Sequence, residues 1–245
     1  MASKPHTDEV HRQQRIVKNP IKFKITLNEE QKEAKAKILE NTLTILAGRA
    51  GSGKTLLAVQ IALDGLLRRH YEKIIITRPT VSKEEIGFLP GDLREKMDPW
   101  VQPIYQNFFA LYDKVKVEKL ITDGKIEIVP VSFMRGRTFM DSMIIVDEAQ
   151  NVTHEQMEMI TSRIGLRSKM MICGDQHQTD LKRKADSGFK FLYSAARKIK
   201  NLEAITLTAN HRNEIVEDLL EFYNEAVDKG VSITTSGSYI YNSKN

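Results

Sequence analysis

The chain has 245 residues, of which 41% are hydrophobic and 28% are charged, and its formal net charge is +5. This composition is typical of a soluble globular protein and excludes a disordered or a fibrous chain. No apolar run approaches the ~18 residues that a membrane helix needs, and the opening residues lack the apolar stretch of a signal peptide. The single cysteine, Cys173, excludes an intramolecular disulfide. We therefore expect a cytoplasmic protein that does not cross a membrane.

The positive charge is concentrated near the N-terminus. Residues 1–24 contain six Lys or Arg side chains and two acidic ones, a net charge of +4, so the rest of the chain is nearly neutral. We predict a flexible, solvated arm here; the alternative is an arm that lies along nucleic-acid phosphates and makes binding salt-dependent. Residues 25–230 are expected to form one α/β domain. Residues 231–245 are expected to be a polar tail, either a short strand pair or disordered.

Short apolar strands alternate with helices along the predicted domain. The first part contains a helix that Asn28 caps and that runs to about Glu40, a strand over 41–47, a loop over 48–55 and a helix over 56–67. A strand over 73–77, a loop with Pro and Gly, and a helix rich in Phe and Tyr follow. Further strands are predicted at 126–129, 143–146, 170–173 and 204–207, with a helix after Thr153 and a last helix over 214–227. This alternation predicts a mostly parallel sheet with helices on both faces, whose ligands bind beyond the carboxyl ends of the strands.

Residues 48–55 fit the phosphate-binding loop pattern G-x-x-x-x-G-K-S/T without a mismatch. The loop consists of Gly48, Arg49, Ala50, Gly51, Ser52, Gly53, Lys54 and Thr55. It lies between an apolar strand and a helix, where curled backbone N–H groups and the helix dipole attract anions. We expect ATP to bind here, with Lys54 at the β- and γ-phosphates and the Thr55 hydroxyl on Mg²⁺.

Two acids follow the apolar run Met143–Val146, about ninety residues beyond the loop. Asp147 is predicted to hold Mg²⁺ through its water shell, and Glu148 to orient and deprotonate an attacking water. A small-molecule kinase needs no water-activating acid at this place. The pair therefore favours hydrolysis over transfer to a small acceptor.

Three further residues have a predicted role and an open alternative. Gln178, supported by Asp175, is expected to sense the γ-phosphate; the alternative is a turn in which the Asp caps the next segment. Gln31 completes the helix cap, and in many helicase-like ATPases a Gln before the first strand reads the adenine edge; the two roles are compatible. Arg212, after the last strand, is expected to stabilise charge on the transferred phosphoryl group, and its alternative is a surface arginine.

Together these residues resemble the PhoH-like ATPase family, relatives of the superfamily 1 helicase core, over roughly residues 27–225. Beyond the two nucleotide motifs, the resemblance rests on residues 77–79, 87–93, 96–99, 133–138, 147–151 and 174–176. Arg212, Val216 and Tyr223 also fit the family spacing, whereas Asn213 and Glu214 stand where the family has His-Pro. The resemblance implies a single RecA-like P-loop NTPase domain, Mg²⁺-dependent ATP hydrolysis and an RNA- or DNA-directed, helicase-like role. Short stand-alone versions are common in bacteriophages, which implies the host cytoplasm as the location.

Two expectations about partners follow. A helicase of this superfamily has two RecA-like domains, and this chain has one phosphate loop, so Arg212 as a finger would come from a neighbouring subunit. We therefore predict a homo-oligomer, a ring with ATP at the subunit interfaces. Arg78, Arg135 and Arg137 lie among aromatic residues, a pattern that favours single-stranded RNA or DNA, although the aromatics would equally serve packing. The alternative function is an ATP-driven protein remodeller or regulatory switch without a nucleic-acid substrate.

Overall fold

The computed structural model defines two compact units, residues 1–209 and 210–245, and each is described by itself. Within the first unit it describes residues 21, 23–79, 93–176, 178, 181, 186–196 and 198–209. Within the second it describes residues 215–216, 218–219, 222, 231–233 and 239–241. The side chains of residues 93–99 are outside the description, as is most of the predicted N-terminal arm.

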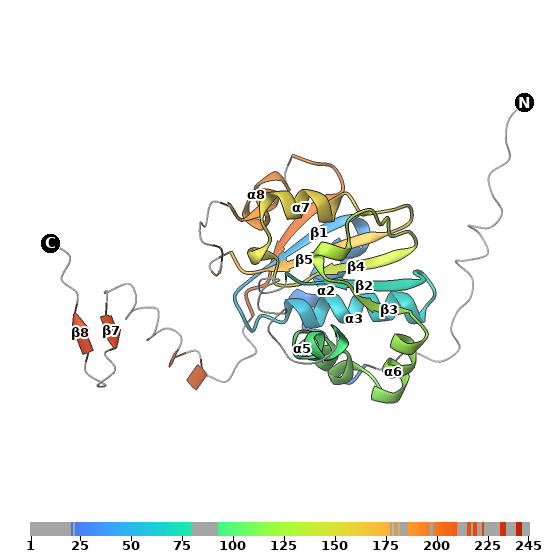
Figure 1. The fold of residues 1–245 in the computed structure, drawn as a ribbon, viewed down its shortest axis with the longest axis horizontal. Coiled ribbons are helices and arrows are strands. Elements are labelled where there is room, and N and C mark those ends of the chain that lie inside the picture. Colours follow the sequence, from blue (N-terminus) through green and yellow to red (C-terminus); the bar gives the residue numbers. More distant parts are fainter. Residues whose placement is uncertain are drawn as a thin grey trace, which may run out of the picture. The chain divides into compact units, whose positions relative to one another are not determined.

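A six-stranded parallel sheet forms the centre of the first unit (Figure 1). Its strands are β1 (Leu43–Ala47), β2 (Lys73–Thr77), β3 (Ile126–Ile128), β4 (Ser142–Val146), β5 (Lys169–Gly174) and β6 (Leu202–Thr206). They lie in the order β3-β2-β4-β5-β1-β6, and every neighbouring pair is parallel. All six carboxyl ends therefore lie at one edge of the sheet, and the predicted α/β class is confirmed.

Helices cover both faces of this sheet. On one face lie α2 (Glu29–Glu40), α3 (Lys54–Leu67), α5 (Leu93–Leu111) and α6 (Lys114–Thr122), and on the other α7 (His154–Thr161) and α8 (Gly188–Ala195) (Figure 1). Successive strand residues point to opposite faces. Ile74 and Ile76 accordingly pack in the core under α3, whereas Ile75 packs in the core under α7 and α8. This two-sided burial explains why the central strands read as continuous apolar runs.

Some elements differ from the sequence prediction. The helix after the phosphate loop begins at Lys54 rather than at residue 56, and β6 spans 202–206 rather than 204–207. Because β6 is an edge strand and is mostly half-buried, its residues carry a weak apolar signal. The sequence also gave no sign of α6 and α8 as separate helices. Both are short, with nine residues in α6 and eight in α8, so they leave few turns in which helical spacing can be recognised. Asp113 caps α6 through a bond from the N–H of Lys116, whereas Ser187 before α8 makes no side-chain capping bond.

The second unit contains an antiparallel strand pair, β7 (Val231–Ile233) and β8 (Tyr239–Tyr241), so the strand-pair alternative for the tail is the one observed. The described residues of the predicted helix over 214–227 have helical backbone, and Arg212 lies outside the described residues. Throughout the part of the chain that is described, no helix is both long and apolar enough to span a membrane.

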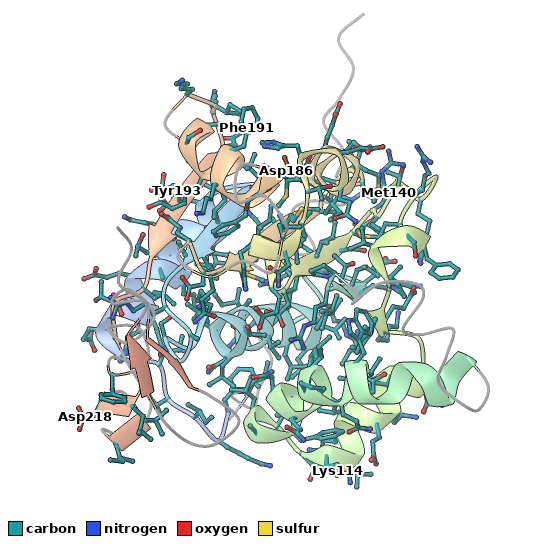
Figure 2. The ribbon with its side chains drawn as sticks, turned by 60° about the vertical axis from the view of Figure 1, so that its left-hand side comes forward. Lys114, Met140, Asp186, Phe191, Tyr193 and Asp218 are labelled. Carbon is teal, nitrogen blue, oxygen red and sulfur yellow. The ribbon has the colours of Figure 1, made fainter. Side chains whose placement is uncertain are left out.

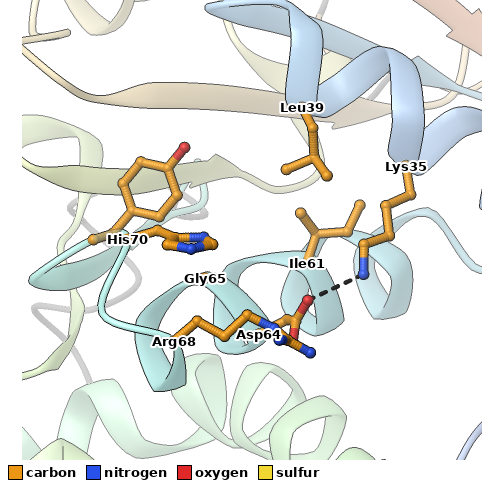
Figure 3. Close-up of a pocket in the computed structure, with 8 residues that line it drawn as sticks. Lys35, Leu39, Ile61, Asp64, Gly65, Arg68 and His70 are labelled. Carbon is orange, nitrogen blue, oxygen red and sulfur yellow. Dashed lines mark hydrogen bonds and ion pairs between the residues drawn. The ribbon is translucent and has the colours of Figure 1, made fainter. Parts of the chain in front are cut away.

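A pocket of about 370 Å³ lies between α2 and α3 (Figure 3). A helix rises about 1.5 Å per residue, so Asp64 on its wall lies about 15 Å along the axis of α3 from Lys54. Lys35 of α2 reaches across to Asp64 at 3.1 Å, and Arg68 donates to the same carboxylate at 2.7 Å. The charges of this pocket are thus paired with one another, and it is separate from the phosphate loop.

Candidate nucleotide site

The predicted nucleotide residues meet at the carboxyl edge of the sheet. The phosphate loop follows β1, and the two acids follow β4. Strand β5 lies between β1 and β4, so Asp175, which comes directly after β5, lies between the loop and the acids. Strand β5 pairs in parallel with β4, the strand that the two acids follow.

Two glycines shape the phosphate loop. A Cβ atom on Gly48 would lie 2.6 Å from the carbonyl oxygen of Leu207 and 2.6 Å from the hydroxyl of Ser52, so a larger residue does not fit. Gly53 has a left-handed backbone, with φ 79°, and directly precedes α3. The N–H groups in the first turn of a helix have no partner within the helix, and such a turn is a ready anion site. The local backbone therefore suits a phosphate chain.

The Lys54 side chain folds back over this loop. Its Nζ donates to the carbonyl oxygens of Gly48 at 2.8 Å and Arg49 at 2.9 Å. Burial lowers the pKa of the Lys54 ammonium, while the nearby charges of acidic groups, Asp175 among them, act in the opposite direction. The cation is therefore held over the loop, in the place where the sequence motif requires it.

Thr55 and Asp147 come together at the start of α3. The Thr55 hydroxyl donates to Oδ1 of Asp147 at 2.7 Å, and the backbone N–H of Asp147 donates to the carbonyl oxygen of Thr77 at 2.8 Å. Burial raises the pKa of Asp147, and the Thr55 hydrogen bond and the charge of Arg78 oppose that rise. Hydroxyl and carboxylate oxygens are hard ligands of the kind Mg²⁺ prefers, so the pair fits this cation.

Few protein ligands are available to such a cation. No group of three or more His, Cys, Asp and Glu side chains among the described residues is arranged to hold a metal ion. Mg²⁺ in phosphate-transfer sites typically takes one or two protein ligands and completes its shell with waters and phosphate oxygens. Thr55 and Asp147 match that pattern.

Glu148 has an unusual backbone conformation, and its carboxylate contacts two other side chains. Its φ of 50° and ψ of 38° are left-handed, which is uncommon for a residue other than glycine. One carboxylate oxygen, Oε2, accepts from Nε2 of Gln150 at 2.6 Å. The other, Oε1, lies 3.6 Å from Nη2 of Arg78. The side chain is 42% exposed, so water can reach it.

Asp175 and Gln150 link the acids to the phosphate loop. The backbone N–H of Ala50 donates to Oδ2 of Asp175 at 3.1 Å, and the N–H of Asp175 donates to Oε1 of Gln150 at 3.1 Å. Both side chains are buried. Sequence reasoning assigned no role to Gln150, and its only signal was its place in the stretch 147–151. Gln178, the predicted sensor, is exposed in the structure.

Gln31 lies at the start of α2. Its N–H donates to Oδ1 of Asn28, and its Oε1 accepts from the N–H of Asn28, so the predicted capping box is confirmed. Glu30 accepts from the backbone N–H groups of Thr208 and Ala209, which follow β6. The first turn of α2 therefore lies at the same sheet edge as the phosphate loop, and adenine recognition by Gln31 stays a prediction.

The three arginines predicted to contact nucleic acid have different surroundings. Arg78 lies beside Glu148, as described above. Arg137 pairs with Glu127 at 2.9 Å and lies over the ring of Phe139, with 4.7 Å between Cζ and the ring centre. Arg135 is exposed, as is Phe133, at 61%. Met140, 56% exposed, lies further along the same segment (Figure 2). Arg137 is thus built into the fold, whereas Arg135 is accessible.

Comparisons with known proteins show the family to which the chain belongs. A family described as PhoH-like protein matches residues 24–224. A PhoH-like protein of Bacillus subtilis is 42% identical over 201 residues, covering 81% of this chain and 62% of the relative. A PhoH-like protein of Synechocystis is 37% identical over 192 residues, covering 77% and 58%. The chain thus spans about three fifths of the length of these curated relatives.

A comparison of solved structures finds the Pif1 helicase from Candida albicans, which is 18% identical, with a TM-score of 0.45. That alignment covers 87% of this chain and 46% of the helicase chain. The family match covers most of the chain, and the sequence relatives are well above 30% identity. The chain belongs to the PhoH-like protein family.

Proposed function

We propose that this chain hydrolyses ATP at the phosphate loop, with Mg²⁺, and couples the reaction to single-stranded RNA or DNA. The observation that carries the hydrolysis is the 2.7 Å bond between the Thr55 hydroxyl and Asp147, two residues that are far apart in the sequence. It brings the helix that follows the loop to the strand end that bears Glu148. Phosphate-binding, cation-binding and water-activating groups therefore occupy one place.

Each residue at this place has a distinct proposed role. The loop N–H groups and Lys54 bind the phosphates, and Thr55 and Asp147 hold Mg²⁺, which would neutralise phosphate charge. Glu148 accepts a proton from the attacking water as the water oxygen bonds to the γ-phosphorus. The bond from that phosphorus to the bridging oxygen breaks, and ADP and phosphate leave.

Two roles remain proposals from the sequence. Gln178 is proposed to contact the γ-phosphate, and it is exposed. Arg212 is proposed to stabilise the transferred phosphoryl group from a neighbouring subunit. Arg212 lies outside the described residues.

The coupling to nucleic acid is supported by the segment that follows β3. Phe133 and Arg135 present an exposed ring and an exposed positive charge within three residues of each other. Single strands are bound by this combination, because charges contact phosphates and flat rings stack on bases. The basic segment 1–24 adds charge of the same sign. The alternative, a protein remodeller or switch, is favoured by the nearly neutral charge of the remaining chain.

Steady-state ATP hydrolysis, measured with and without single-stranded RNA and DNA, tests the coupling. The blank is Glu148→Gln. The matched variants are Arg135→Ala and Arg167→Ala; both arginines are exposed, but only Arg135 lies in the segment between β3 and β4. We expect one polymer to stimulate the wild type, and the stimulation to weaken with salt and in Arg135→Ala. Hydrolysis that is indifferent to both polymers would contradict the coupling and point to a protein client.

A further inference from the structure

The parallel pairing of β2 with β4 places Arg78 beside Glu148. Thr77 is in register with Val146, and the N–H of Asp147 donates to the carbonyl oxygen of Thr77 at 2.8 Å. Arg78 directly follows Thr77, and Glu148 directly follows Asp147, two residues after Val146. Their side chains form an ion pair at 3.6 Å, in which the Arg78 side chain is 27% exposed. The contact is therefore a consequence of strand register rather than of a chance surface encounter.

Gln150 holds the same carboxylate from another side. A backbone N–H can only donate, so the N–H of Asp175 requires Oε1 of Gln150 to face it. The Nε2 group must then face Glu148, to which it donates at 2.6 Å. The backbone carbonyl oxygen of Gln150 accepts from the Ser187 hydroxyl at 3.2 Å, and the residue is 4% exposed. The orientation of this amide is thus fixed by its surroundings.

The backbone of Glu148 also indicates a held conformation. A left-handed φ at a residue other than glycine persists only where the surrounding structure determines it, and such residues cluster at functional sites. Here the residue lies between a buried strand and the short turn 149–151. The direction of its side chain is therefore set by the backbone conformation and by the contacts with Arg78 and Gln150.

We infer that Arg78 and Gln150 are positioning residues for Glu148, an inference that rests on the proposed ATP hydrolysis. An ionised carboxylate has about four lone-pair sites, so two partners leave room to accept the proton of a water molecule. Gln150 also contacts Asp175, which binds the N–H of Ala50 in the phosphate loop. The general base and the loop are consequently held by one continuous chain of hydrogen bonds.

Arg78→Ala is the first test, with Arg78→Lys and Arg167→Ala as companions. Arg167 is a matched control because it also pairs with a carboxylate, that of Asp141, at the opposite end of β4. We expect Arg78→Ala to lower kcat about 10- to 100-fold, because small displacements of a catalytic group are that costly, while KM and the affinity for a fluorescent ATP analogue stay unchanged. Arg78→Lys should restore part of the rate, and Arg167→Ala should keep the wild-type kcat.

A double-mutant cycle shows whether Arg78 acts through Glu148. In the Glu148→Gln background the charge that Arg78 pairs with is gone, so Arg78→Ala should have little further effect on the residual rate. An equal loss in both backgrounds, or a raised KM with unchanged kcat, would overturn the inference. A raised kcat would overturn it too, since Arg78 would then restrain Glu148 instead of positioning it.

The outcomes separate this inference from the proposed function. A wild type without ATP turnover would overturn both. A wild type that hydrolyses ATP, together with an unchanged Arg78→Ala, would overturn the positioning role alone. Gln150→Ala should show the same fall in kcat with unchanged nucleotide affinity, with its melting temperature measured alongside to monitor folding.

Discussion

At the scale of single residues, the site depends on contacts between distant parts of the chain. Thr55 and Asp147 are separated by 92 positions and meet at 2.7 Å. The sequence predicts this pair, because each residue belongs to a motif whose place on a strand end or helix start is recognisable. The sheet order then explains the meeting, since the loop after β1 and the acids after β4 open at the same edge.

Thr55 offers a direct test of the cation site. Thr55→Ala removes the hydroxyl that binds Asp147, and we expect the Mg²⁺ requirement for hydrolysis to rise at least about tenfold. Thr55→Ser keeps the hydroxyl and serves as the control. The measurement is the hydrolysis rate over a series of Mg²⁺ concentrations. The same Mg²⁺ dependence in Thr55→Ala and wild type would remove Thr55 from the cation site.

The neighbours of Glu148 were not predictable in the same way. Gln150 is a buried amide whose role depends on which groups face it, and no residue pattern reports that. Arg78 was expected to contact nucleic acid because it is basic and follows a strand. Its contact with Glu148 depends on the register between β2 and β4, which requires the three-dimensional pairing.

At the scale of elements, buried strands were predicted best. Strands β2 and β4 are covered on both faces, so burial leaves a continuous apolar run in the sequence. Strand β6 lies at the sheet edge. Because its residues are mostly half-buried, the sequence does not mark clearly where this strand begins and ends. Helix α2 was predicted from its capping box, whereas α8 starts without one. Local signals thus account for the prediction of the buried strands and of α2.

The cap of α2 allows the two roles of Gln31 to be separated. Asn28→Ala and Gln31→Ala each remove one half of the capping box, and each should lower the free energy of unfolding in urea by about 1 kcal/mol. If Gln31 only caps the helix, neither variant changes ATP affinity; its Oε1 accepts from the N–H of Asn28, and the residue is 5% exposed. Weaker ATP binding and lost preference over GTP in Gln31→Ala alone would instead establish adenine recognition.

At the scale of the whole molecule, the proposed ring depends on a residue supplied between subunits. Arg212 belongs to the second unit, residues 210–245, and the phosphate loop belongs to the first. A finger in trans stays a prediction from the sequence. A head-to-tail contact of this kind closes into a ring or continues as a filament.

Mixing two inactive proteins tests this assembly. Lys54→Ala protein retains Arg212 but lacks the phosphate-binding lysine. Arg212→Ala protein retains that lysine but lacks the arginine. In a mixed oligomer some interfaces combine an intact loop with an intact arginine, so the mixture should hydrolyse ATP faster than the two proteins measured apart. The control is a mixture of Lys54→Ala with Glu148→Gln, whose defects lie in the same site. A rate for the first mixture no higher than the sum of its parts would contradict a finger in trans.

The most direct test of the nucleotide site compares ATP binding and phosphate release in wild type, Lys54→Ala and Glu148→Gln. If the loop and the acids form one hydrolytic site, the wild type binds and cleaves ATP, Lys54→Ala loses both properties, and Glu148→Gln binds ATP with near wild-type affinity but cleaves it only at a small residual rate. The Glu148→Gln result is decisive, because it separates holding the nucleotide from activating water. Normal cleavage by Glu148→Gln, or normal turnover by Lys54→Ala, would contradict the assignment of this site.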